Sequence, residues 1–99
     1  MIIVSGTARV PVDAMARWQS GAAEVIAATR REAGCRAYSF AEDVIEPGLI
    51  HTFEMWDSRG HLDAHLQTPH VKAWREVLAE VKVRDRVFHT YEAGEGMPL

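Results

Sequence analysis

Four stretches of the chain show the residue pattern of β-strands. Residues 2–10 place apolar side chains at every second position with Ser, Thr and Arg between them, which is the period of a strand with one buried face. Residues 35–43 and 49–57 are rich in aromatic and other apolar residues, and a Pro-Gly pair between them favours a turn. Residues 84–92 complete the set. The pattern predicts four strands, of which the second and third form a hairpin.

Helical periodicity fills the first interval between these strands. Apolar residues recur there at steps of three and four, and Asp13 can cap the start. We expect a helix from about Asp13 to Glu32 that stops at Gly34. Its apolar stripe consists of Met15, Trp18, Ala22, Val25, Ile26 and Thr29.

The second interval predicts a broken helix. Ser58 is an N-cap candidate for a short helix, and Thr68 is a second cap followed by Pro69 at its favoured first helical position. The apolar stripe of the new helix consists of Val71, Trp74, Leu78 and Val81. The order β-α-β-β-α-β is a split βαβ arrangement, in which four antiparallel strands carry both helices on one face. The expected fold class is α+β, ferredoxin-like, in one domain over residues 1–99.

The helices cover only one face of the predicted sheet. Whether the even-numbered or the odd-numbered strand positions point to the helices, the other face also carries apolar side chains. The third strand has Phe53 and Met55 on one side and Ile50 and Trp56 on the other. An apolar sheet face in water is unfavourable, so we expect a second copy of the sheet to cover it. The sequence therefore predicts a homodimer.

Composition and charge exclude several classes of partner. The chain has 11 basic and 14 acidic residues without a run of either sign, so a nucleic-acid or anionic membrane surface is not expected. There is no apolar run long enough to span a bilayer and no basic leader, which favours a cytoplasmic protein. The single cysteine, Cys35, excludes an internal disulfide and fits no zinc pattern.

Three of the five histidines lie in the stretch HLDAHLQTPH. His61 and His65 share a helix face at a spacing that can bind a divalent ion, but His70 would have to reach across the break. No carboxylate-rich pattern surrounds the pair, so we do not expect a metal. His65 lies in the last turn of the short helix, where the dipole favours imidazolium, and His70 lies at a helix start that favours the neutral ring. Such a split suits proton transfer if both rings face a cavity.

Other chemical candidates come from the strands and the helix stripes. His51 shares a side with Phe53, whereas Glu54 and Trp56 share the opposite side, where a buried carboxylate would need a partner such as His65 or an arginine. Trp74 either packs in the core or lines a pocket, and Tyr38 and Tyr91 are the phenols available to orient a substrate. Glycine-rich phosphate loops and nucleophile signatures are absent, so no dinucleotide or covalent-nucleophile chemistry is indicated.

The segments AGCRAYSFAED and FEMWDSRGHLDAHLQTPHVKAW resemble the antibiotic biosynthesis monooxygenase family. The matching positions are Gly34, Cys35, Tyr38, Glu54, Trp56, Ser58, Leu62, His65, Thr68 and His70. The resemblance implies a dimer whose two sheets form an α+β barrel, with a pocket between each sheet and its helices. Family members include enzymes that oxidise quinols or anthrones with molecular oxygen and no flavin, haem or metal, so it also implies a small aromatic substrate and no cofactor.

The resemblance assigns roles to particular side chains. His65 would handle the proton, His70 would be its neutral neighbour, and Trp56 would be a pocket wall and hydrogen-bond donor, with His51 a further catalytic candidate. The substrate-binding candidates are Tyr38, Phe53, Trp74, Tyr91 and Thr7. Thr7 or Ser5 would replace an asparagine that several members use, because this sequence has none.

The same resemblance disfavours one other function and leaves two open. In the haem-degrading branch a histidine lies further along the helix, near the position of Arg75, which argues against haem degradation. An isomerase of small phosphorylated or hydroxylated diketones and a non-enzymatic ligand-binding dimer would use the same pocket.

Overall fold

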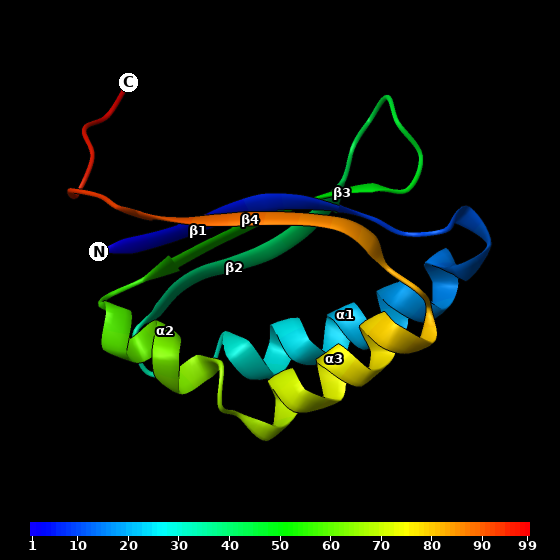
Figure 1. Cartoon of the computed structure of the whole chain (residues 1–99). Helices are drawn as coiled ribbons and strands as arrows, with labels where there is room; N and C mark the ends of the chain where they lie inside the picture. The colour runs from blue at the N-terminus through cyan, green and yellow to red at the C-terminus, as the bar shows by residue number, and fades with distance from the viewer.

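The computed structural model describes residues 1–99 and shows one four-stranded sheet with helices on one face (Figure 1). The elements are β1 (Ile2–Arg9), η1 (Val12–Ala14), α1 (Met15–Thr29), β2 (Cys35–Glu42), β3 (Leu49–Trp56), α2 (Arg59–His65), α3 (Pro69–Glu80) and β4 (Arg84–Glu92). The strand order is β2-β3-β1-β4 with antiparallel neighbours. The predicted α+β, ferredoxin-like class is confirmed. None of the helices has the length and apolar composition needed to cross a bilayer.

The first helix differs from its prediction at both ends. Asp13 lies in the 3₁₀ turn η1, and the N-cap of α1 is Ala14, which makes no side-chain cap hydrogen bond, so the predicted cap was wrong. The α-helix ends at Thr29, and the chain turns back through hydrogen bonds such as Glu32 N to Thr29 O at 2.9 Å. Glu32 therefore lies in a turn beyond the helix, which lets its side chain cross toward α2 and α3.

The break between the second and third helices has the predicted chemistry. Ser58 Oγ accepts a hydrogen bond from His61 N, and Thr68 Oγ1 accepts one from Val71 N at 3.3 Å. The Thr68 hydroxyl also donates to the His65 carbonyl at 2.8 Å, and Pro69 occupies the first turn of α3. The Thr68 cap and Pro69 thus fix the corner at which α2 stops and α3 starts, whereas Ser58 caps the start of α2.

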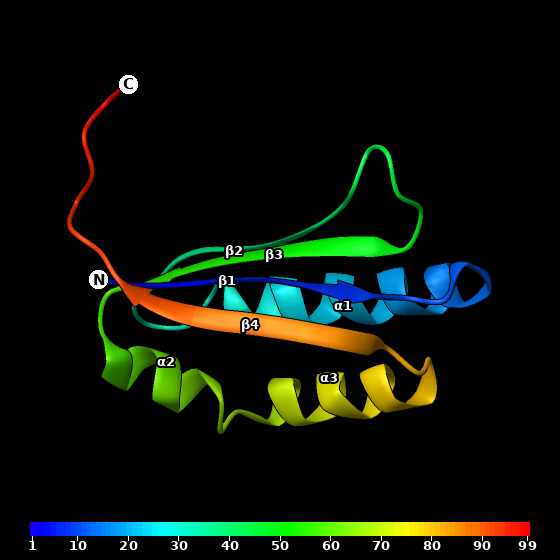
Figure 2. The same cartoon turned by 45° about the horizontal axis from the view of Figure 1, so that its top comes forward.

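Even-numbered positions of β1 and β3 face the helices. Ile50 and Trp56 are buried there, and the register places Val4 beside Glu54 and Glu54 beside Tyr38. The core is completed by residues from the helices, among them Trp18, Ala22, Val25, Leu62, Val71 and Trp74. Figure 2 shows β4 at the edge of this sheet, with α2 and α3 on the side below it.

Odd-numbered positions of the same strands face away from the helices. Ser5 pairs with Phe53, Thr7 pairs with His51, and Ile3 pairs with Tyr91. Phe53 and Tyr91 are 39% and 54% exposed on this outer face. The sequence left the buried parity open, and the structure resolves it in favour of the face that carries Glu54 and Trp56.

Replacing Thr68 with Ala should lower the free energy of unfolding by about 1 kcal/mol, because the cap to Val71 and the bond to the His65 carbonyl are both lost. Urea denaturation followed by circular dichroism measures the change. Ser20→Ala, on the exposed side of α1, is the matched hydroxyl deletion and should change stability by less than about 0.5 kcal/mol. Equal effects of the two substitutions would contradict the capping role.

Candidate active site

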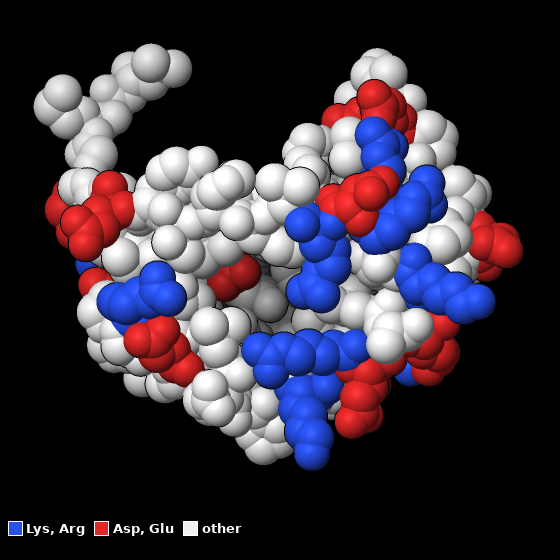
Figure 3. All heavy atoms as spheres, viewed as in Figure 1, with Lys and Arg blue, Asp and Glu red and all other residues white.

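A cavity of about 240 Å³ lies between the inner face of the sheet and the helices α2 and α3. Thirteen of its 20 lining residues are hydrophobic, and they include Trp18, Tyr38, Phe40, Ile50, Trp74 and Phe88. Figure 3 shows the hollow from the side of β4, with charged side chains at its rim. An apolar cavity of roughly 150 Å³ can hold benzene, so this one has room for an aromatic compound of one or two rings.

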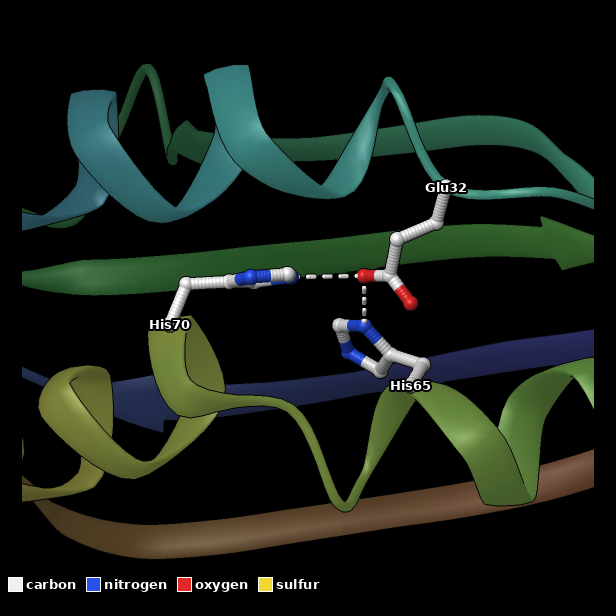
Figure 4. A group of neighbouring side chains, drawn as sticks. All are labelled: Glu32, His65 and His70. Atoms are coloured by element: carbon white, nitrogen blue, oxygen red, sulfur yellow. Dashed lines mark hydrogen bonds and ion pairs between the residues drawn. The ribbon is translucent and has the colours of Figure 1, made fainter.

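Glu32 joins the two histidines that flank the helix break. Its Oε2 atom lies 2.7 Å from His65 Nδ1 and 2.7 Å from His70 Nε2 (Figure 4). The His65 side chain is 3% exposed, that of Glu32 15% and that of His70 26%, so the group extends from the core toward solvent. A carboxylate oxygen can only accept, so both ring nitrogens donate to it. Glu32 was not predicted as a site residue from the sequence, because its partners lie more than 30 residues away along the chain.

The hydrogen bond from His65 to Glu32 sets the tautomer of the buried ring. With the proton on Nδ1, the Nε2 atom of His65 is an acceptor, and Figure 4 shows this second nitrogen on the side of the ring away from Glu32. His65 lines the cavity, so the geometry fits a base that takes a proton from a bound molecule.

Burial determines the charge of His65. Loss of hydration lowers the pKa of His65 below its ordinary value, although the bond to Glu32 and the charge of Glu32 both raise it. The prediction that the end of α2 would hold His65 as imidazolium was therefore wrong. The desolvation of a buried ring outweighs the partial charge of a short helix.

Glu32, His65 and His70 also form a possible set of metal ligands. Their donor atoms all lie within 4.8 Å of one another, and two histidines with one carboxylate suit several divalent ions. The sequence pattern around His61 and His65 did not indicate this carboxylate, which comes from the turn after α1. His61 is not part of the group, because its ring bonds Ser58 Oγ at 2.8 Å. An ion between the three side chains would have to displace both protons that Glu32 Oε2 now accepts.

Glu54 and Trp56 form a second buried polar contact. The indole Nε1 of Trp56 donates to Glu54 Oε1 at 2.9 Å, so the partner of this carboxylate is neither His65 nor an arginine. Burial raises the pKa of Glu54 more than the indole bond lowers it. The Trp56 ring is completely buried and packs against the His65 ring, with the two ring centroids 4.7 Å apart.

The structure brings together only part of the predicted site. His65, Tyr38 and Trp74 line the cavity, while Trp56 and His70 contact this group without lining it. The four candidates on the outer face of the sheet, away from the cavity, are Thr7, His51, Phe53 and Tyr91. Successive side chains of a strand point to opposite faces, so these odd-numbered positions are separated from Glu54 by the sheet itself. The ring of His51 instead bonds Asp43 in the turn before β3, at 2.9 Å.

Comparisons with known proteins agree with this fold. The sequence model of the antibiotic biosynthesis monooxygenases matches residues 1–77. An uncharacterised Synechocystis protein is 31% identical over 98 residues, which are 99% of this chain and 67% of that protein. The Escherichia coli protein named "probable quinol monooxygenase YgiN" is 36% identical over 64 residues, or 57% of this chain and 62% of that protein, less than two thirds of its length.

Solved structures show the same arrangement. A Deinococcus radiodurans protein assigned to the antibiotic biosynthesis monooxygenases is 32% identical with a TM-score of 0.92, and the match covers 100% of this chain and 98% of that one. A Mycobacterium tuberculosis protein is 26% identical with a TM-score of 0.86, and the match covers 98% of both chains.

Replacing Glu32 with Gln should lower the pKa of His65 further, because the carboxylate raises it through both its charge and its hydrogen bond. NMR titration of the His65 ring protons measures the pKa, which should lie below 6.5 in the unaltered protein. Glu24→Gln, on the exposed side of α1, is the matched control and should leave the titration unchanged. An unchanged or raised His65 pKa in the Glu32 variant would contradict the coupling.

Proposed function

The chain belongs to the antibiotic biosynthesis monooxygenase family, and from this premise we propose that it oxidises a quinol- or anthrone-type aromatic compound with molecular oxygen, without a cofactor. The observation that supports this most is the Glu32–His65 hydrogen bond beside an apolar cavity. A phenol becomes readily oxidisable when it loses its proton, and a buried neutral histidine is suited to accept that proton.

In the proposed reaction His65 Nε2 takes the phenolic proton of the bound substrate. The His65 ring then becomes an imidazolium. Glu32, which is hydrogen-bonded to His65 Nδ1, stabilises this positive charge, as a hydrogen-bonded carboxylate does for a catalytic histidine. His70 donates its Nε2 proton to the same carboxylate oxygen and is the most exposed of the three, so it holds Glu32 in place from the solvent side. Glu32 is in this scheme a positioning residue, because it acts through His65.

The substrate supplies the electrons for the reduction of oxygen. With a naphthalenediol, one oxygen atom becomes a hydroxyl group on the quinone that forms. The other oxygen atom leaves as water with the equivalent of the two phenolic hydrogens, so atoms and electrons balance without a further reductant. The apolar walls formed by Trp74, Phe40 and Leu62 admit oxygen and exclude bulk water from the ionised ring.

A proton-transfer isomerase is the second candidate, and the shared carboxylate between two histidines favours it. Such an enzyme would move a proton between two carbon atoms of a hydroxylated diketone and would consume no oxygen. Oxygen uptake therefore separates the two activities. A ligand-binding protein without activity would tolerate the loss of His65 but not of the apolar wall.

We also propose that residues 1–99 form a single domain and that two copies of this domain pair through the outer face of the sheet. Val87, Phe53 and Tyr91 expose apolar surface there, on β4 and β3. Exposed apolar area on one sheet face is efficiently covered by the same face of a second copy, since a two-fold interface is complementary to itself. The outer-face candidates Thr7 and His51 would then lie in or beside the interface.

Metal-stripped protein should consume oxygen with a hydroquinone, naphthalenediol or anthrone, and labelled oxygen gas should appear in the product quinone. His65→Ala should lower kcat/KM by roughly a hundredfold or more, because the general base is lost. The activity of the unaltered protein should fall on the acid side with an apparent pKa below 6.5, since neutral His65 is the reactive form.

His51→Ala, on the outer face, is the control for that experiment and should retain activity within about twofold. Boiled protein corrects for autoxidation, and a melting curve shows that each variant is folded. Full activity of His65→Ala would remove this residue from the mechanism, and activity that depends on a restored metal would contradict the cofactor-free reaction.

Light scattering at micromolar concentration should give twice the chain mass of 11.1 kDa. Phe53→Glu and Val87→Glu each place a charge on the outer face and should shift the protein toward monomer. Gln19→Glu adds the same charge on the exposed side of α1 and should leave the mass unchanged. A monomeric unaltered protein would contradict the proposed pairing.

A further inference from the structure

The cavity has chemically different ends along β4. Thr90 pairs with Val4, which pairs with Glu54, so this end of the cavity holds the buried carboxylate and His65. Arg86 lines the cavity four residues earlier on the same strand. At about 3.3 Å per residue, the two positions lie roughly 13 Å apart. A proton acceptor and a permanent cation therefore occupy separate ends of one apolar space.

A second arginine comes from the opposite wall. Arg75 lies in the middle of α3 and lines the same cavity. Figure 3 shows Lys and Arg side chains above and below the hollow, with acidic atoms visible at one side of it. Guanidinium groups from β4 and α3 are thus among the groups that line the cavity, while most of its lining residues are hydrophobic.

Neither of these two arginines has an acidic partner. Most of the chain's other surface arginines do, and Arg59, which also lines the cavity, bonds Asp63 at 3.1 Å. No carboxylate lies within 4.0 Å of the guanidinium nitrogens of Arg75 or Arg86. Arg86 instead lies over the Phe88 ring, 5.9 Å from its centroid, a cation–π contact that holds its guanidinium at the cavity wall.

Unpaired guanidinium groups beside an apolar space are suited to bind an anion. Charge-assisted hydrogen bonds to a carboxylate or phosphate are stronger than neutral ones, and the planar guanidinium matches both groups with two parallel donors. A neutral quinol would leave both arginines without a partner.

We infer that the cavity takes an aromatic compound that carries an ionised acidic group in addition to its reacting hydroxyl, and that Arg75 and Arg86 bind that group. The inference deepens the proposed function, on which it rests for the identity of the reacting end. The ring would lie along the apolar walls, its hydroxyl at His65 and its acid at the two arginines. Arg75 and Arg86 are then specificity-determining residues.

Isothermal titration calorimetry under nitrogen measures binding without turnover. The probes are β-naphthol and two derivatives that keep its hydroxyl group and carry either a carboxylate or a phosphate ester at the far end of the second ring. We expect the two anions to bind at least about tenfold more tightly than β-naphthol at low salt, and the advantage to shrink as ionic strength rises. The better of the two anions identifies the acidic group.

The Arg75→Met/Arg86→Met double variant should bind β-naphthol as before and lose the preference for the anions to within about twofold. Arg31→Met is the matched control, an exposed arginine outside the cavity, and should keep the preference. Equal binding of all three probes by the unaltered protein, or an anion preference that survives in the double variant, would overturn the inference.

The outcome does not depend on catalysis. Anion-selective binding without oxygen uptake would support the inference and count against the monooxygenase. Oxygen uptake with β-naphthol-type substrates and no anion preference would support the monooxygenase and overturn the inference.

Discussion

The site depends on one carboxylate oxygen that accepts hydrogen bonds from two histidines. Glu32 Oε2 connects the turn after α1 to the last residue of α2 and the second residue of α3, so three separate segments meet at one atom. This contact fixes the tautomer of His65 and its orientation at the cavity. It also counteracts the effect of burial on the pKa of His65, although burial prevails. The corner at Thr68 and Pro69 makes the contact possible, because it brings His70 back toward the ring of His65.

The two faces of the sheet differ in function: the inner face lines the cavity, and the outer face is the proposed interface. The inner face combines Glu54 and an aromatic wall into a cavity that is also lined by His65 and by the cations Arg75 and Arg86. The outer face carries exposed apolar side chains that suit contact with a second copy. A strand that alternates at every residue can serve both, so one short sequence such as that of β3 contributes to a site and to a proposed interface at once.

Much of the local structure was predictable from short-range patterns. The strand positions, the helix caps Ser58 and Thr68 and the hairpin were predicted correctly, because turn and cap chemistry acts over a few residues. His65, Tyr38 and Trp74 were identified as candidates and do line the cavity, whereas the cap at Asp13 failed because the chain enters α1 through a 3₁₀ turn. His51 and Phe53 were selected by residue type alone, and residue type does not reveal on which face of a sheet a side chain lies.

The order of the elements, the broken second helix and the family were predictable from the sequence, because periodicity, caps and motif spacing are properties of neighbouring residues. The structure was needed to show which strand parity is buried, that Glu32 joins His65 to His70, and that Arg75 and Arg86 line the same cavity. These are contacts between residues distant in sequence. They follow from how the sheet packs on its helices, and that packing is a global minimum over the whole chain that a local pattern does not contain.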